Sequence, residues 1–285
     1  MKSKRILSVL AALLLLISLP GCARLPIAAL PVAGSAEASP AEEAAIAEET
    51  AAPESEKPAP IELPPLPDID INSWEFLYAG PHLGVGRYHP HVGTVDGQYM
   101  DERCTPATAE FLKAARDQGF EVYICSAYRN WEYTVFWYEN AMHQYGEYDT
   151  EYCHFLPGAS YEAAKHVFAA GCSEHSTGLA FDITDESYYW ADVNYSNIHD
   201  ETVAGTPVCQ WMDEHCAEYG FIVRYPENKS EVYGMACYPG HYRYVGKEAA
   251  AYIMENDLCL EEFLALYGKT IAGVNYVNEY VVREG

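Results

Sequence analysis

The chain has 285 residues and a formal net charge of -25 at pH 7, with 42 acidic residues against 17 basic ones. A surface this acidic repels phosphate groups, so the composition argues against nucleic acid as a partner. Hydrophobic residues make up 49% of the sequence, which is enough to form a sizeable core. Every aromatic residue lies after residue 70, so the folded domain is expected in residues 71–285.

The N-terminus has the pattern of an export signal. A basic start, MKSKR, precedes an almost wholly apolar run over residues 6–18, which ends in LPGC at 19–22. The run is shorter than the roughly 20 residues of a membrane-spanning helix. A cysteine directly after a small residue resembles a bacterial lipobox, which implies a signal peptide over residues 1–21 and a lipid on Cys22. The alternative is an ordinary signal peptide followed by an unmodified cysteine.

The segment from 22 to 70 is dominated by Ala, Pro and Glu. Such a segment buries too little apolar surface to offset the entropy of ordering, so we expect it to be disordered. Its prolines favour an extended chain of about 3.1 Å per residue. The expected organisation is a lipid-anchored, extracytoplasmic domain at the cell membrane, held on an acidic tether.

Eight cysteines lie in the domain. They are Cys104, Cys125, Cys153, Cys172, Cys209, Cys216, Cys237 and Cys259. An even number of cysteines in an exported domain favours disulfides, up to four, whose pairing the sequence does not assign. No C-x-x-C pair occurs, which argues against a cysteine-ligated zinc site.

Local signals predict helices mixed with a few short strands. Helices are expected over residues 105–118, 131–145, 206–219, 247–257 and 260–268. Strands are expected over residues 120–125, 179–184, 221–224 and 241–245. Because the strands and helices do not alternate regularly, the pattern indicates an α+β domain with a small antiparallel sheet flanked by helices.

The segment SEHSTGLAFD, residues 173–182, places a histidine and an aspartate seven residues apart. On the predicted strand, Asp182 lies on the face opposite the large apolar residues. His175 lies in the preceding loop, where Gly178 allows a tight turn. Two such side chains fit two corners of a metal site, and they fit equally well a His–Asp hydrogen bond that closes the loop.

Two further segments accompany this one, SAYR at 126–129 and YPGHYRYVG at 238–246. Together and in this order, the three motifs resemble the zinc D,D-carboxypeptidases and D,D-dipeptidases of the VanY and VanX type, the D-alanyl-D-alanine carboxypeptidase family. The resemblance covers roughly residues 75–267. It implies the zinc D,D-peptidase (hedgehog-like) fold and an activity on peptidoglycan stem peptides that end in D-Ala.

The resemblance also implies roles for individual residues. His175, Asp182 and His241 are expected to bind one Zn²⁺, and three protein ligands leave a fourth position for water, as in catalytic zinc sites. Arg129 is expected to bind the terminal carboxylate of the substrate, which suits a planar guanidinium, and Ser173 to contact the substrate. The alternative for Arg129 is a surface ion pair in this acidic protein.

The sequence departs from the family at the position of the general base. The third motif of the family reads Glu-Pro-Trp-His, and its glutamate takes a proton from the attacking water. Here the glutamate position is Tyr238 and the tryptophan position is Gly240. A phenol with an unperturbed pKa near 10 is a poor base at neutral pH.

Other carboxylates lie near the motifs in the sequence. Glu174 adjoins His175 and is expected to point away from the site, whereas Asp185 and Glu186 are alternative bases. Thr134 also replaces a glutamine that is common in the family. Three functions are therefore compatible with the sequence, namely a zinc peptidase, a zinc-containing module that binds stem peptides without cleaving them, and a metal-free structural lipoprotein.

Overall fold

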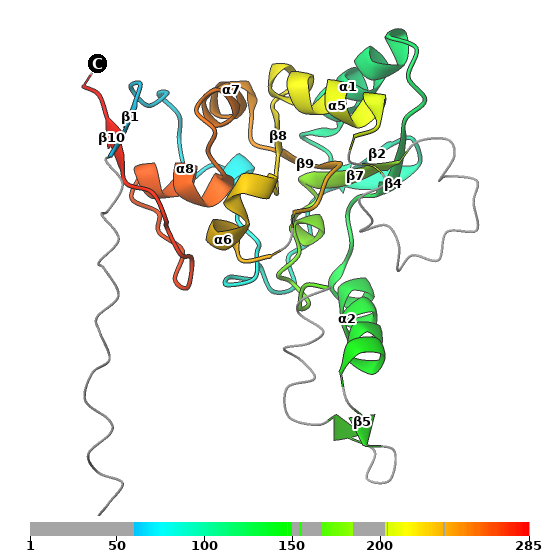
Figure 1. The fold of residues 1–285 in the computed structure, drawn as a ribbon. Coiled ribbons are helices and arrows are strands. Elements are labelled where there is room, and N and C mark those ends of the chain that lie inside the picture. The colour runs from blue at the N-terminus through cyan, green and yellow to red at the C-terminus, as the bar shows by residue number, and fades with distance from the viewer. Residues whose placement is uncertain are drawn as a thin grey trace, which may run out of the picture. The chain divides into compact units, whose positions relative to one another are not determined.

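The computed structural model describes residues 60–146, 148–149, 154–155, 167–184, 203, 205–235 and 237–284, all of which lie in one compact unit, Glu56–Gly285. Its central element is a four-stranded antiparallel sheet with the order β4-β7-β9-β8 (Figure 1). The strands are β4 (Tyr123–Ser126), β7 (Ala180–Thr184), β8 (Phe221–Val223) and β9 (His241–Tyr244). The prediction of an α+β domain with a small antiparallel sheet is confirmed.

Helices α1 (Thr105–Asp117) and α5 (Pro207–His215) cover one face of this sheet (Figure 1). Phe111 of α1 is fully buried and packs against the ring of Phe181 on β7. Alternate residues of a strand point to opposite faces, so the large apolar residues of β7 enter this core. Asp182, between them in sequence, is left on the other face.

A second core forms around α7 (Lys247–Glu255) and α8 (Leu260–Leu266). Two short strands pair in parallel beside it, β1 (Ile61–Leu63) and β10 (Tyr280–Val282), and Leu63 is only 2% exposed. The prediction that the disordered tether extends to residue 70 therefore needs correction. Residues 61–70 lie in the packed domain, because Leu63 finds its apolar surroundings in helices about 190 residues later in the chain.

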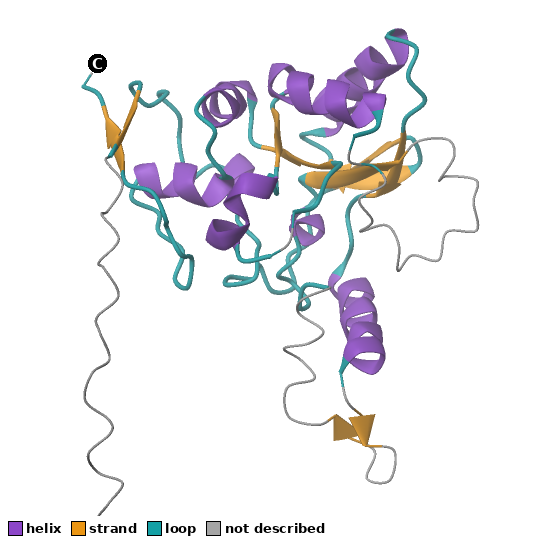
Figure 2. Cartoon of the chain, viewed as in Figure 1, coloured by secondary structure: helices purple, strands orange, loops and turns teal. Residues whose placement is uncertain are grey.

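The remaining elements are peripheral to the sheet (Figure 2). Helix α2 spans Trp131–Tyr145, as predicted, and begins at the N-cap Asn130, whose side chain accepts a hydrogen bond from the backbone of Tyr133. The other elements are α6 (Ser230–Tyr233) and the hairpin strands β2 (Val92–Val95), β3 (Gln98–Asp101), β5 (Tyr148–Asp149) and β6 (His154–Phe155).

The prediction of disulfides is wrong for the seven cysteines that the structure describes, all of which are free thiols. Cys104 and Cys216 belong to the core of the central sheet, whereas Cys259 is buried in a different cluster. A buried thiol behaves as a small hydrophobic side chain, so the buried cysteines contribute to packing rather than to cross-links. Cys153 lies outside the described residues.

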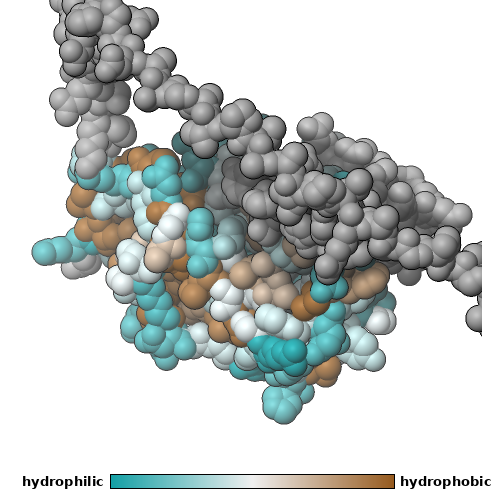
Figure 3. Space-filling view, turned by 90° about the horizontal axis from the view of Figure 1, so that it is seen from below, coloured by the Kyte–Doolittle hydropathy of each residue, from teal (hydrophilic) through white to brown (hydrophobic). Residues whose placement is uncertain are grey.

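The surface of the described domain shows no segregation into apolar and polar regions on the face drawn in Figure 3, where hydrophobic and hydrophilic residues are intermingled. Among the described residues, none of the helices has the length and hydropathy needed to span a membrane. The predicted signal peptide, residues 1–21, and Cys22 lie outside the described part of the chain.

Candidate metal centre

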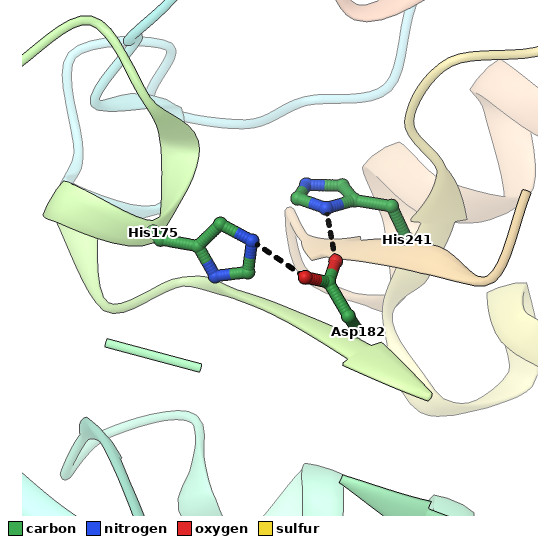
Figure 4. A group of neighbouring side chains, drawn as sticks. All are labelled: His175, Asp182 and His241. Carbon is green, nitrogen blue, oxygen red and sulfur yellow. Dashed lines mark hydrogen bonds and ion pairs between the residues drawn. The ribbon is translucent and has the colours of Figure 1, made fainter. Parts of the chain in front are cut away.

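Three side chains converge where β7 and β9 pair (Figure 4). Asp182 and His241 are directly opposite each other in the antiparallel register, so their side chains lie on the same face at close range. His175 comes from a short 3-10 helix, Glu174–Thr177, that leads into β7. We call His175, Asp182 and His241 the metal cluster.

The loop that carries His175 is fixed by its own sequence. The side chain of Ser173 caps the 3-10 helix by accepting a hydrogen bond from the backbone N–H of His175 at 3.3 Å. Gly178 ends the helix with a φ of 76°, and a Cβ there would lie 2.9 Å from the backbone nitrogen of Asp101. Both the conformation and the space require glycine. The backbone N–H of Arg129 donates to the carbonyl of His175, which ties the SAYR segment to this loop.

The two imidazoles approach the carboxylate from different sides. Nε2 of His175 lies 3.0 Å from Oδ2 of Asp182, and Nδ1 of His241 lies 2.6 Å from Oδ1. One ligand atom from each residue lies within 4.8 Å of the other two, and all three residues are buried. On the outer side of His175, Nδ1 is 2.7 Å from the carbonyl oxygen of Ala127. That carbonyl fixes Nδ1 as the protonated nitrogen and leaves Nε2 with a lone pair directed at the cluster.

Electrostatics keep the cluster in the form that binds a metal. Burial acts to raise the pKa of Asp182, but the neighbouring His175 and His241 outweigh it and hold this pKa well below its usual value. Burial, assisted by the charge of Arg129, lowers the pKa of His175 to about 4. At neutral pH, His175 is therefore neutral and Asp182 is ionised, the protonation states that a metal requires of its ligands.

The donor set fits zinc. Two imidazole nitrogens and one carboxylate oxygen are the ligands of an open, catalytic zinc site. Nε2 of His175 is buried and has no hydrogen-bond partner among the described residues, and a metal ligand atom needs none. Across the part of the chain that the structure describes, this is the one group of three His, Cys, Asp or Glu side chains close enough to share an ion.

Arg129 reaches the edge of the metal cluster. Its Nη2 lies 3.3 Å from Oδ2 of Asp182, and its Nε donates to the hydroxyl of Ser126 at 3.0 Å. The side chain keeps 21% of its surface exposed, so it borders the cluster while remaining open to solvent.

The predicted contact residue Ser173 is 6% exposed, and its hydroxyl caps the 3-10 helix. Thr134 is turned into α2, where it donates to the carbonyl of Trp131.

Tyr238 is buried beside the metal cluster. Its ring lies 5.3 Å from the ring of His241, centroid to centroid, and it is 7% exposed. Burial raises its pKa well above the usual value, and the charge of Asp182 and a hydrogen bond to it raise the pKa further. The phenol is therefore protonated at neutral pH. Position 240 has little space for a side chain, because a Cβ there would lie 3.0 Å from Val203 and 3.2 Å from Ile183.

Glu174 is not a member of the metal cluster and belongs instead to a group of buried charges that the sequence did not reveal. Its Oε1 lies 3.0 Å from Nε of Arg224 and 2.8 Å from Nη1 of Arg243. Arg224 also forms a bidentate pair with Glu261, at 2.6 and 3.0 Å. All four side chains are fully buried, and we call them the ionic cluster. The alternative bases Asp185 and Glu186 lie outside the described residues.

One sequence feature could have indicated the ionic cluster, namely an arginine within or directly after a short buried strand. Arg224 follows the apolar β8, Phe221–Val223, and Arg243 lies two residues after His241 on the same face of β9. Such positions are buried in a small sheet, and a buried arginine needs carboxylate partners. Nothing in the sequence indicates that Glu261, in α8, is one of those partners.

Comparisons with known proteins agree with this arrangement. Residues 97–247 match the model of the family described as VanY, D-alanyl-D-alanine carboxypeptidase. A D-alanyl-D-alanine carboxypeptidase of Enterococcus faecalis is 37% identical over 169 residues, which are 59% of this chain and 57% of that protein. The chain thus spans little more than half the length of this relative.

Two solved structures are similar in fold. One is the vancomycin resistance D,D-pentapeptidase VanY, as a variant in complex with Zn(II), with a TM-score of 0.55 and 30% sequence identity over 67% of this chain and 99% of that one. The other is VanYB in complex with D-alanine-D-alanine, with the same TM-score and identity over 68% of this chain and 98% of that one.

Proposed function

Because the chain belongs to the D-alanyl-D-alanine carboxypeptidase family, we propose that it is a zinc-dependent D,D-carboxypeptidase-like hydrolase of peptidoglycan stem peptides that end in D-Ala. The observation that carries this proposal is the preorganised metal cluster, with Arg129 at its edge. Similar proteins supply the substrate class, since one of them is in complex with D-alanine-D-alanine and another with Zn(II).

The residues divide the work as follows. A zinc ion held by His175, Asp182 and His241 would polarise the scissile carbonyl and activate the attacking water. The guanidinium of Arg129 binds the terminal carboxylate of the peptide, because it is charged, bidentate and partly exposed beside the metal cluster. Binding at this end places the last peptide bond over the cluster, and this orientation is a large part of the rate enhancement.

Tyr238, at the position of the family's general base, limits the rate of hydrolysis. A protonated phenol does not accept the proton of the attacking water, but it can donate a hydrogen bond to the oxyanion that develops during hydrolysis. A missing general base costs about 10²- to 10⁴-fold in rate. The buried, protonated Tyr238 therefore also favours a second candidate, a zinc-containing module that binds stem peptides with little or no turnover.

A digest of purified peptides ending in D-Ala-D-Ala separates these candidates, with zinc measured on the same samples. We expect slow release of D-alanine by the wild type and a rise of about 10²-fold or more in Tyr238→Glu. Arg129→Gln should weaken peptide binding, whereas Arg116→Gln, which removes a guanidinium paired with Asp96 away from the metal cluster, should not. A zinc-loaded wild type that binds the peptide without any cleavage supports the binding module, and absence of zinc contradicts both.

The sequence patterns supply the proposed location. We propose that Cys22 is lipidated and holds the domain outside the cell membrane, within reach of peptidoglycan. Metabolic labelling with a palmitate analogue should mark the wild type but not Cys22→Ala, and the variant should leave the membrane fraction. A labelled Cys22→Ala protein, or an unlabelled wild type, contradicts the lipid anchor without affecting the proposed chemistry.

A further inference from the structure

Three buried polar atoms, one of them on a member of the metal cluster, have no hydrogen-bond partner in the part of the chain that the structure describes. They are Oε2 of Glu174, Nε2 of His241 and the hydroxyl of Tyr225. The three residues are 0%, 2% and 1% exposed, respectively. Buried polar atoms are nearly always hydrogen-bonded, to protein or to an ordered water, so three of them in one region call for a shared partner.

The three residues are neighbours. The rings of Tyr225 and His241 lie 5.1 Å apart, and the backbone N–H of Arg224, the residue before Tyr225, donates to the carbonyl of His241. Arg224 also connects this pair to Glu174, because its Nε lies 3.0 Å from Oε1 of that carboxylate. Glu174 in turn lies 2.8 Å from Nη1 of Arg243, which follows His241 by two residues on β9. Glu174, Tyr225 and His241 are therefore connected through the same two arginines and the same strand.

The tautomer of His241 requires a partner for Nε2. Its Nδ1 faces Asp182, and Figure 4 shows the other ring nitrogen on the far side of the ring from that carboxylate. An imidazole that presents Nδ1 to a metal carries its proton on Nε2, and metal-bound histidines almost always donate this N–H to a carboxylate, a carbonyl or a water. Glu174 has one oxygen engaged by Arg224 and Arg243 and one that remains available.

We propose that Glu174 is a positioning residue for His241, receiving its Nε2–H through one buried water that also contacts the hydroxyl of Tyr225. Three partners are the usual complement of a buried water. The ionic cluster holds Glu174 in place, and Glu174 in turn fixes the tautomer and ring orientation of a metal ligand. The inference rests on the zinc site of the proposed function, and it extends that site to residues that touch neither metal nor substrate.

The main test compares two carboxylates that share one arginine. Glu174→Gln and Glu261→Gln each remove one buried negative charge from Arg224, but in the proposed arrangement only Glu174 receives the Nε2–H of His241. We expect Glu174→Gln to raise the Kd for zinc, measured by competition with a chromophoric chelator, by about 10- to 100-fold. Glu261→Gln should leave this Kd within about two-fold of the wild type. Equal changes in the two variants overturn the inference.

A second pair of variants keeps the test decisive if the first pair does not fold. Tyr225→Phe removes one partner of the water, and we expect it to raise the zinc Kd by roughly 2- to 10-fold. Tyr233→Phe is the matched control, because Tyr233 packs on Tyr225 but bonds to the carbonyl of Pro226. An unchanged Kd in Tyr225→Phe overturns the inference. A wild type that binds no zinc overturns the proposed function as well.

Discussion

The metal cluster and the ionic cluster share the 3-10 helix Glu174–Thr177 and strand β9, yet their charges are arranged oppositely. His175 follows Glu174, and His241 precedes Arg243 by two residues on β9. The ionic cluster joins two carboxylates to two guanidiniums, so its charges cancel. The metal cluster joins one ionised carboxylate to two imidazoles, and Nε2 of its His175 has no hydrogen-bond partner among the described residues.

This difference separates two roles of buried polar side chains, stabilising the fold and binding a metal. A balanced group of buried charges contributes to the stability of the folded state only while every member is present. A group with lone pairs directed at a common centre is incomplete without a cation, so its contribution depends on pH and on metal. Substitutions of the arginines of the ionic cluster should therefore act mainly on folding, whereas substitutions in the metal cluster should act on metal binding and on the pH dependence of stability.

The largest expected effect is that of Arg243→Met. The substitution keeps the apolar stem but leaves Glu174 with one guanidinium instead of two, and breaking a buried ion pair from one side costs about 3–5 kcal/mol. Urea denaturation of the zinc-free protein measures the loss. Arg283→Met is the control, since its pair with Glu62 is exposed and should be worth less than about 1 kcal/mol. Similar losses in the two variants would show that the ionic cluster is not a special contributor to stability.

A pH titration addresses the metal cluster. The pKa of His175 is lowered from 6.5 to about 4 in the folded protein, so the unfolded chain takes up the proton first as the pH falls. The free energy of unfolding of the zinc-free protein should therefore decrease by about 3 kcal/mol between pH 6.5 and pH 4. The buried Asp182 and Glu174 have lowered pKa values, so their contributions are lost only at lower pH.

Urea denaturation at several pH values checks this expectation. In His175→Gln the slope between pH 6.5 and pH 4 should flatten, because the titrating group is gone. A slope that persists in the variant would assign the pH dependence to other groups.

Binding of zinc should raise the free energy of unfolding by slightly less than the change expected from the pH titration. A ligand that binds only the folded state at 100 times its Kd adds about 2.7 kcal/mol. Addition of zinc should raise the Tm of the wild type, and a chelator should reverse the rise. His241→Gln should abolish the response, whereas His215→Gln should retain it, because His215 is paired with Glu218 on the surface. An equal response in both variants would place the zinc elsewhere.

The metal cluster could be predicted through the resemblance to a known family, and the ionic cluster could not. Local pattern placed His175 and Asp182 in one ten-residue motif and Asp182 on the face opposite the apolar core, but it fitted a His–Asp hydrogen bond equally well, and only the resemblance added His241 and the metal. The ionic cluster depends on Glu174 meeting Arg243 and Arg224 meeting Glu261, over 69 and 37 positions of sequence. No local pattern specifies which distant carboxylate neutralises a buried arginine.

Two other expectations failed for the same reason. The tether was predicted to reach residue 70 because residues 22–70 lack aromatic side chains, but Leu63 is buried by helices near the C-terminus. The disulfides were inferred from the number of cysteines, but the thiols of Cys104 and Cys259 lie in different cores. Composition describes what a segment can bury by itself and does not describe what the rest of the chain provides.

Tyr238 could support the fold, as the ionic cluster does, or serve the metal cluster, because it is a neutral side chain next to Asp182, the charged member of that cluster. Tyr238→Phe removes its hydrogen bond to Asp182, but that carboxylate keeps His241 and Arg129 as partners. Because no buried charge is left without a partner, we expect the free energy of unfolding of the zinc-free protein to fall by only about 1 kcal/mol. A loss above about 3 kcal/mol in urea denaturation would show that Tyr238 supports the fold in the manner of the ionic cluster. Its presence in place of a glutamate would then serve stability rather than the chemistry of the site.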